Sequence, residues 1–334
     1  MLAIIIFAAC VIPAGAAANE SSFGAYEHVF IIGVDGAGAA FSKVDSPNFD
    51  RIFADNAYTH TSVTEYITTS AQNWGSILTG VDYETHGMTN DSTDVSQPKK
   101  TSDTGYKTIF YYARQAFPKA KLVSISHWFN INHGLIENDI GVKKSWRNSD
   151  PMVVDAVINA VQAPVVAKLM FVQLDDVDHA AHTYGGYSDE YYAAVEKMDE
   201  NLGYIYDAIE KRGLMENSLF IVVADHGETT GGHGGQSPDE SVAVLGVAGK
   251  TVNKTILGEG VHNRDVSAIA LYALGIEQPE HFISSVPDGL FGDAREKTVE
   301  ANPIAAGDKM WHNFLYIFVR MTNLLVNMFD FIQI

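Results

Sequence analysis

Short apolar runs that alternate with helical patterns are the feature that most constrains this fold. The runs are HVFIIGVD (28–35), KLVSIS (121–126), KLMFVQLD (168–175), SLFIVVAD (218–225) and VAVLGVAG (242–249), and the helical patterns cover 47–55, 72–79, 104–116, 151–162, 188–212 and 264–274. Continuously apolar strands interleaved with helices are typical of a parallel sheet that is covered on both faces. The sequence therefore predicts an α/β fold, a three-layer α/β/α doubly wound arrangement with a mostly parallel sheet.

The charge balance excludes one large class of function. The 334 residues include 41 Asp and Glu against 22 Lys and Arg, which gives a formal net charge of −19. Nucleic-acid binding needs a basic surface for phosphate contacts, so we expect none here. Such a field also repels an anionic substrate, unless a bound metal ion reverses the charge locally.

The N-terminal segment resembles a targeting signal. Residues 1–18 combine an apolar run with an Ala-rich end, and an A-x-A site lies near Ala16–Ala18. We interpret this segment as a secretory signal peptide, although no Lys or Arg precedes the apolar run; a short buried strand or an anchor is the alternative. Cleavage would remove Cys10, the one cysteine, and leave no disulfide and no cysteine ligand. We therefore expect a secreted or cell-surface protein.

The C-terminal segment differs from the rest of the chain, so we divide the chain into a catalytic domain at 24–292 and a tail at 293–334. The end of the tail reads MWHNFLYIFVRMTNLLVNMFDFIQI, with polar residues in one narrow stripe of an otherwise apolar helical pattern. Arg320 and Asp330 argue against a plain transmembrane span. Peripheral membrane contact, docking of a partner, and packing back onto the domain all remain open.

Acids and histidines follow three of the predicted strands. They are Asp35 after the first strand, Asp175, Asp176, Asp178 and His182 after the third, and Asp225, His226 and His233 after the fourth. Ligands bind at the carboxyl ends of strands in such sheets, so we expect these side chains to meet there. Oxygen and imidazole donors without thiolate suit zinc or a similar divalent ion, and the number of groups suffices for two ions.

Two such ions suit phosphoryl transfer, which also needs a hydroxyl nucleophile at the start of a helix. The stretch ITTSAQNWGSILTGVDYETHGM (67–88) supplies four hydroxyls, on Thr68, Thr69, Ser70 and Ser76. The residues alone leave open which of them reacts.

These motifs resemble the alkaline phosphatase superfamily, most closely its type I phosphodiesterase/nucleotide pyrophosphatase branch, over about residues 28–276. The matching segments are VFIIGVDGAG, DSPNFDRIF, SAQNWGSILTGVDYETHGM, DVDHAAHTYGG and ADHGE, the last standing where D-H-G-M is usual. In this superfamily the nucleophile precedes the glycine of the TG pair by ten positions, which points to Ser70, with Thr69 as the alternative register. The resemblance also assigns Asn73 to holding the transferred group.

The resemblance implies two metal sites. One would use Asp35, Ser70, Asp225 and His226; the other would use Asp178, His182 and a third histidine. DHGETTGGHGG also resembles the catalytic domain of the GPI ethanolamine-phosphate transferases, which favours His233 as that histidine. His262 is the rival, because the nucleotide pyrophosphatase branch places it later in the chain.

The resemblance thus implies a phosphoester hydrolase with two divalent ions, most simply zinc, and a phospho-serine intermediate. Diesterases of this branch usually carry threonine as the nucleophile, whereas this chain has Ser70. The choice between a monoester and a diester substrate therefore stays open. A phospho-group transferase and an inactive metal- or ligand-binding relative also fit these motifs. The substrate would be a phosphorylated small molecule or a lipid or nucleotide ester. Substrate contacts are predicted only by residue type, at Trp128, Phe129, Tyr184, Arg114 and Arg147.

Overall fold

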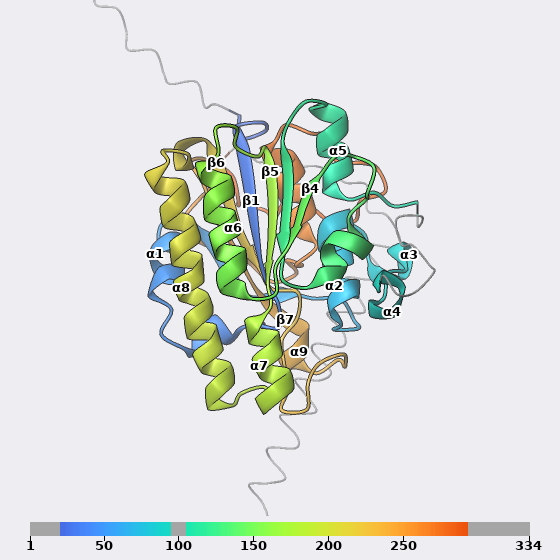
Figure 1. Ribbon diagram of the computed structural model, residues 1–334, viewed down its shortest axis with the longest axis vertical. Coiled ribbons are helices and arrows are strands. Elements are labelled where there is room, and N and C mark those ends of the chain that lie inside the picture. The colour runs from blue at the N-terminus through green and yellow to red at the C-terminus, as the bar shows by residue number, and fades with distance from the viewer. Residues whose placement is uncertain (1–20, 95–104, 293–334) are drawn as a thin grey trace, which may run out of the picture.

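The computed structural model describes residues 21–94 and 105–292 (Figure 1). The predicted signal peptide at 1–18 and the predicted tail at 293–334 lie outside the described residues. The described strands form one sheet in the order β4-β3-β5-β1-β6-β7-β2-β8. Their bounds are β1 His28–Val34, β2 Ala57–Val63, β3 Leu122–Ser126, β4 Lys143–Trp146, β5 Leu169–Leu174, β6 Ser218–Val223, β7 Val242–Ala248 and β8 Thr255–Ile256.

The sheet is mostly parallel, as predicted. β1 lies between β5 and β6 and pairs with both in parallel, while β7 runs antiparallel to its neighbours β6 and β2. All five apolar runs form strands. The remaining strands were not predicted: the centre of β2 (AYTHTSV) is a run of four polar residues, β4 (KKSW) carries charge because it lies at the sheet edge, and β8 has two residues.

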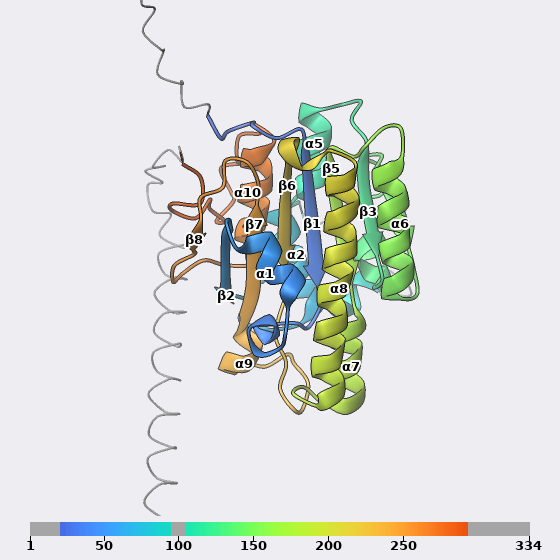
Figure 2. The same ribbon diagram turned by 90° about the vertical axis from the view of Figure 1, so that its left-hand side faces the viewer.

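Helices cover both faces of the sheet (Figure 2). One layer contains α1 Pro47–Phe53, α6 Asp150–Gln162 and α8 Asp189–Lys211; the other contains α2 Ser70–Thr79, α5 Ile109–Ala116 and α10 Asp265–Ala273. The side chains of β1 alternate between the two layers: Val29 and Ile31 pack against the second layer, Phe30 and Ile32 against the first. The predicted α/β/α fold is therefore confirmed.

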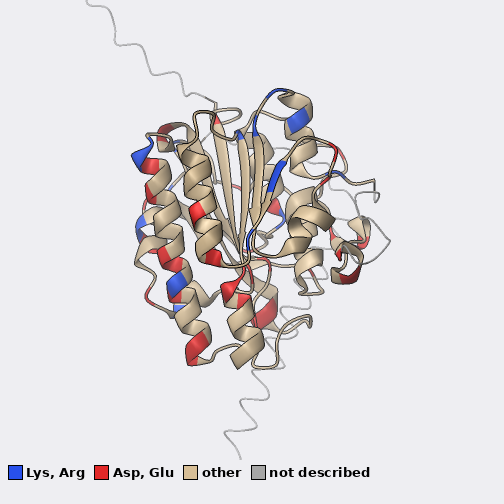
Figure 3. Cartoon of the chain, viewed as in Figure 1, with Lys and Arg blue, Asp and Glu red and all other residues tan. Residues whose placement is uncertain are grey.

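Shorter elements surround the carboxyl edge of the sheet. They are η1 Ala40–Lys43, α3 Tyr83–His86, α4 Asn90–Thr93, η3 Ile131–Leu135, α7 Asp176–Tyr184 and α9 Pro238–Ser241, whereas η4 Met215–Asn217 lies at the opposite edge, directly before β6. Among the described residues, no helix combines the length and apolar character that crossing a bilayer requires. Acidic residues recur along α8 and on α7 with few basic residues among them (Figure 3).

Close packing of α2 onto β1 depends on one glycine. A Cβ atom at Gly33 would lie 2.4 Å from Cη2 of Trp74, so any other residue there would displace the indole. Trp74 is fully buried and also makes an edge-to-face contact with Phe171 of β5. This contact fixes α2 over the centre of the sheet, with its N-terminus at the carboxyl ends of the strands.

Candidate metal centre

Three neighbouring strands deliver the acids of the site. Because β5, β1 and β6 are adjacent and parallel, Asp175, Asp35 and Asp225 emerge at the same edge. Asp35 and Asp225 are almost completely buried, and Ser70, the first residue of α2, is 8% exposed.

A first group of donors surrounds the Nε2 atom of His226. This nitrogen lies 3.5 Å from Asp35 Oδ1 and 3.2 Å from Asp225 Oδ2. The Ser70 hydroxyl oxygen is 3.4 Å from the same nitrogen. The structure therefore brings together all four residues that the family resemblance assigned to one metal site.

Further contacts orient three side chains of this group, those of Asp35, Asp225 and His226. Trp74 Nε1 and Gln173 Nε2 both donate to Asp35 Oδ2, at 2.8 and 2.9 Å, which leaves Oδ1 facing the group. The backbone N–H of Gly36 donates to Asp225 Oδ1. His226 Nδ1 lies 3.1 Å from the carbonyl oxygen of Gly227, which fixes its proton on Nδ1 and leaves the Nε2 lone pair available.

A second group comes from α7 and the loop after β6. Asp178 and His182 are four residues apart on α7, with His182 Nε2 3.5 Å from Asp178 Oδ2. His233 Nε2 lies 3.1 Å from His182 Nε2 and 3.4 Å from Asp178 Oδ1. The Nδ1 atom of His233 donates to the carbonyl oxygen of Thr68 at 2.6 Å, so its Nε2 lone pair also faces the group.

His262, the rival ligand, has a different environment. It forms a bridge with Val63 at the end of β2, and its backbone N–H donates to Asp265. The next residue, Asn263, donates to Asn73 and to the carbonyl oxygen of Asp225. The segment that carries His262 therefore braces the site, while His233 is the histidine placed beside Asp178 and His182.

The hydrogen bonds of Asn73 do not fit the role that the resemblance assigned to it, which is to hold the transferred group. Its side chain is fully buried, and its Oδ1 accepts from the backbone N–H of Glu65 and from Asn263. Its Nδ2 donates to the carbonyls of Ile67 and Thr69. Since these four bonds use the whole amide, Asn73 holds the loop before α2 and has no donor left for a transferred group.

Asn90, which the sequence analysis missed, stands closer to Ser70. Its Oδ1 accepts from the backbone N–H of Ala71 at 2.9 Å, so the exposed amide lies at the N-terminus of α2 and keeps its NH₂ group as a donor. Nothing in the sequence marked it, because Asn90 follows Ser70 by twenty positions and only the α3–α4 turn returns it to the helix start.

The donor sets fit divalent metal ions. A tetrahedral ion with bonds of about 2.0–2.1 Å separates neighbouring ligand atoms by about 3.3 Å, and the donor distances given above range from 3.1 to 3.5 Å. Asp35 Oδ1, Asp178 Oδ1 and Asp225 Oδ2 are buried without a hydrogen-bond partner. Buried carboxylate oxygens are normally paired or bind metal, so these atoms point to cations.

The electrostatics of the ion-free side chains lead to the same conclusion. Burial, reinforced by Asp225, raises the pKa of Asp35 well above its usual range, and burial and Asp178 do the same to the pKa of Asp225. Burial and His233 lower the pKa of His226, which favours the neutral form that binds metals. Carboxylates crowded in this way need positive charge nearby to stay ionised.

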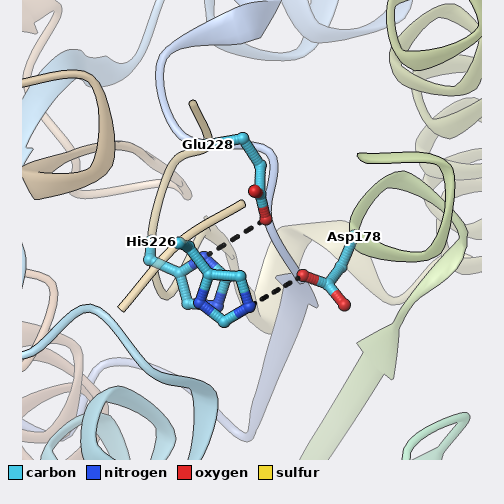
Figure 4. A group of neighbouring side chains, drawn as sticks. Asp178, His226 and Glu228 are labelled. Carbon is cyan, nitrogen blue, oxygen red and sulfur yellow. Dashed lines mark ion pairs between the residues drawn. The ribbon is translucent and has the colours of Figure 1, made fainter. Parts of the chain in front are cut away.

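Glu228 is a second residue that sequence reasoning missed. Figure 4 shows its carboxylate and that of Asp178 beside His226, with Glu228 Oε1 3.8 Å from His226 Nδ1. Burial and the neighbouring Asp178 raise the pKa of Glu228 to about 10. The signal that could have found it is the Glu of ADHGE, which replaces the usual methionine.

A further polar cluster ties β3 to α7. His127 Nδ1 lies 2.8 Å from Asp150 Oδ1, and the same buried carboxylate accepts the backbone N–H groups of Asp175 and Asp176. Gln173 completes the link, since its Oε1 accepts from the backbone of residues 127 and 128. This cluster fixes the end of β3 and the start of α7 beside the metal centre.

The predicted substrate residues are scattered. Phe129 stacks on His133 and meets Trp146 edge to face, whereas Trp128 packs partly against the core. Tyr184, at the end of α7, is 60% exposed. The two arginines that were predicted from residue type alone differ in their contacts. Arg114 has a structural role, because it donates to backbone carbonyls that include those of residues 120 and 140. Arg147 donates to the carbonyl of residue 146.

The α/β fold, with acids and histidines at the carboxyl ends of β1, β5 and β6, is shared with solved proteins of the alkaline phosphatase superfamily. One solved member, from Vibrio parahaemolyticus, is 15% identical and aligns with a TM-score of 0.60 over 79% of this chain and 70% of its own. The model of the type I phosphodiesterase/nucleotide pyrophosphatase family matches residues 29–236, and the chain belongs to that family.

Individual relatives align with different shares of the chain, which spans less than half the length of the two curated relatives named here. GPI ethanolamine phosphate transferase 1 of Saccharomyces cerevisiae is 26% identical over 36% of this chain, which corresponds to 15% of the yeast protein. The human bis(5'-adenosyl)-triphosphatase ENPP4 is 23% identical over 63% of this chain and 49% of its own length. An inactive variant of murine ectonucleotide pyrophosphatase/phosphodiesterase 5, in complex with AMP, shares the fold with a TM-score of 0.63 at 14% identity, over 76% of this chain and 96% of that one.

Proposed function

We propose that this protein is a two-metal phosphodiester hydrolase in which Ser70 is the nucleophile. The convergence of Ser70, Asp35, Asp225 and His226 on one point carries the proposal. Asp178, His182 and His233 form the second donor set. Divalent ions at these positions, of which zinc fits the donors best, would favour the serine alkoxide and stabilise the leaving oxygen.

The chain itself supplies position and polarity. Ser70 is the first residue of α2, so its oxygen lies at the positive end of the helix dipole, which favours an anion. The Asn90 amide at the same helix end adds a donor for an equatorial phosphoryl oxygen. Attack of the Ser70 oxygen on phosphorus expels one alcohol, which takes up the serine proton, and leaves a phosphoryl-serine that still carries the other ester group. Hydrolysis of its Ser–O–P linkage releases a phosphomonoester and restores the hydroxyl.

Family membership supports a phosphoester substrate. The relative that acts on bis(5'-adenosyl)-triphosphate and the solved relative with AMP favour a nucleotide ester. The transferase relatives support a second candidate, transfer of the phosphoryl group to an acceptor alcohol. In that case the phosphoryl-serine would react with the alcohol in place of water.

We propose a secreted or cell-surface setting, on the strength of the apolar and Ala-rich segment at 1–18. Peripheral membrane contact through residues 293–334 is part of the same proposal. Expression of the full chain in a cell with a secretory route, followed by fractionation of medium and membranes, tests it. Recovery only in the cytosol would contradict it.

A substrate panel tests the activity. Zinc-loaded protein is assayed with bis-nitrophenyl phosphate, nitrophenyl phosphate and nitrophenyl thymidine monophosphate, each with and without an acceptor alcohol. We expect the diesters to be cleaved faster than the monoester, and Ser70→Ala to lose roughly 10³-fold or more in kcat. Preference for the monoester would overturn the diesterase assignment, and product formed only with the alcohol would favour the transferase.

A further inference from the structure

Thr68 joins the segment before Ser70 to the loop that carries His233. It is fully buried and stands two residues before Ser70, between β2 and α2. Its carbonyl oxygen accepts from His233 Nδ1 at 2.6 Å. Its hydroxyl oxygen accepts from the backbone N–H of Gly234 at 2.9 Å and donates to the carbonyl oxygen of Gly235 at 3.0 Å. One residue beside the proposed nucleophile thus contacts three consecutive residues of the other loop.

The His233 loop, residues 227–237, needs such contacts because of its composition. Five of its eleven residues are glycine, which loses more conformational entropy on ordering than any other residue. Glu240 supports the same part of the loop, since its carboxylate accepts from the backbone N–H groups of Gly235 and Ser237 and lies 3.3 Å from the Thr68 hydroxyl oxygen. Thr68 and Glu240 together therefore hold the backbone on which the position of His233 depends.

The contacts of Thr68 also connect the two donor sets. The imidazole rings of His233 and His226 stack with their centroids 3.8 Å apart and their planes inclined by 13°. His226 Nε2 in turn lies 3.4 Å from the Ser70 hydroxyl oxygen. A shift of residues 233–235 would therefore displace a histidine of the second donor set, and with it the ring that packs on His226 of the first.

We propose that Thr68 is a positioning residue of the metal centre, which holds His233 in place for the second divalent ion and fixes Ser70 relative to both donor sets. Thr68 acts through these two residues, because its own hydroxyl and carbonyl are directed at residues 233–235. Residues that orient metal ligands in this way contribute to metal affinity, and correct placement of a nucleophile contributes to the rate of attack. The inference rests on the proposed function in that it takes Ser70 as the nucleophile.

Substitution of Thr68 by valine tests the proposal, because it keeps the shape of the side chain and removes the hydroxyl. Metal-free protein is titrated with Zn²⁺ by isothermal titration calorimetry, and diester hydrolysis is followed at saturating zinc. We expect Thr68→Val to bind the first zinc ion like the wild type and the second more weakly by roughly 10-fold or more. We also expect kcat to fall by roughly 10-fold while KM stays nearly constant. Thr68→Ser keeps the hydroxyl and should restore both quantities.

Thr79→Val is the matched control. Thr79 is also fully buried and lies at the other end of α2, where its hydroxyl donates to the carbonyl oxygen of Gly75 in the same helix. Zinc affinity and kcat should keep their wild-type values in this variant. If Thr68→Val does not fold, the comparison of Thr68→Ala with Thr68→Ser carries the same test.

Three results would overturn the inference: unchanged affinity of Thr68→Val for the second zinc ion, unchanged kcat at saturating zinc, or losses in Thr68→Ser equal to those in Thr68→Val. A purely structural role of Thr68 would give the first two, with a lower melting temperature alone. A wild type that binds two zinc ions and cleaves no diester refutes only the proposed function, because the zinc affinities still report on how Thr68 holds His233. Diester cleavage by the wild type and Thr68→Val at equal rates refutes only the role of Thr68.

Discussion

Single residues behind the ligands decide how well the proposed metal site is preorganised. Trp74 is the clearest case, because its indole N–H donates to Asp35 Oδ2 and turns Oδ1 toward His226. Trp74→Phe keeps an aromatic ring and removes that donor. We expect zinc affinity to fall by roughly 10- to 100-fold, as for other residues that orient metal ligands.

A competition titration with a zinc chelator, well below the melting temperature, measures this effect. Trp146→Phe is the control, since Trp146 is 45% exposed and lies at the edge strand β4. Equal zinc affinity in the wild type and Trp74→Phe would show that the indole N–H is not needed to position Asp35, which also accepts from Gln173.

The sequence pattern indicated the charged residues at strand ends. It gave no sign of the residues that position other groups through hydrogen bonds. Asp35 and Asp225 follow apolar runs, so parallel pairing predicts that they meet. Asn90 and Gln173 gave no such signal, because an amide becomes informative only when its partners are known. Asn73 was placed correctly on the helix but given a role that its hydrogen bonds exclude.

At the scale of elements, the junction of α2 and α3 depends on a neutral histidine. His86 Nδ1 accepts from the backbone N–H of Met88 at 3.0 Å, and its Nε2 lies 3.0 Å from the Ser76 hydroxyl. Burial lowers the pKa of His86 to about 4. The ring packs so closely that a Cβ at Gly75 would lie 2.6 Å from its Cε1.

This junction should weaken in acid. The unfolded chain binds a proton at His86 near pH 6.5 while the folded chain does not until about pH 4, so the contribution is present above pH 6.5 and lost between these values. Denaturation of metal-free wild type and His86→Gln measures it. The difference in unfolding free energy should shrink by about 3 kcal/mol from pH 7.5 to pH 4; a constant difference would contradict the assignment.

Elements differed in how far they could be predicted. The five buried strands and the long helices have strong apolar patterns, and all were found. β2 was missed because its centre, THTS, is polar, and α7 because its sequence DVDHAAHTY is dominated by acids and histidines. The spacing of four residues between Asp178 and His182 was nevertheless compatible with one face of a helix in this segment.

At the scale of the whole molecule, metal binding and folding should be coupled. The centre joins the loops after β1, β5 and β6 to α2 and α7, so chelation leaves buried carboxylates facing one another across elements. We expect a chelator to lower the melting temperature by roughly 5–10 °C at pH 7.5 and zinc to restore it. Differential scanning calorimetry with elemental analysis measures this, and an unchanged melting temperature after complete removal of metal would contradict it.

Covalent capture of the intermediate tests the central claim most directly. Zinc-loaded protein is mixed with a diester substrate, quenched in acid within milliseconds, and digested for mass spectrometry. The proposed function predicts a phosphoryl ester of the substrate on Ser70, absent from Ser70→Ala and still present in Thr69→Ala. Rapid hydrolysis with no adduct on Ser70, or an adduct on Thr69, would contradict it.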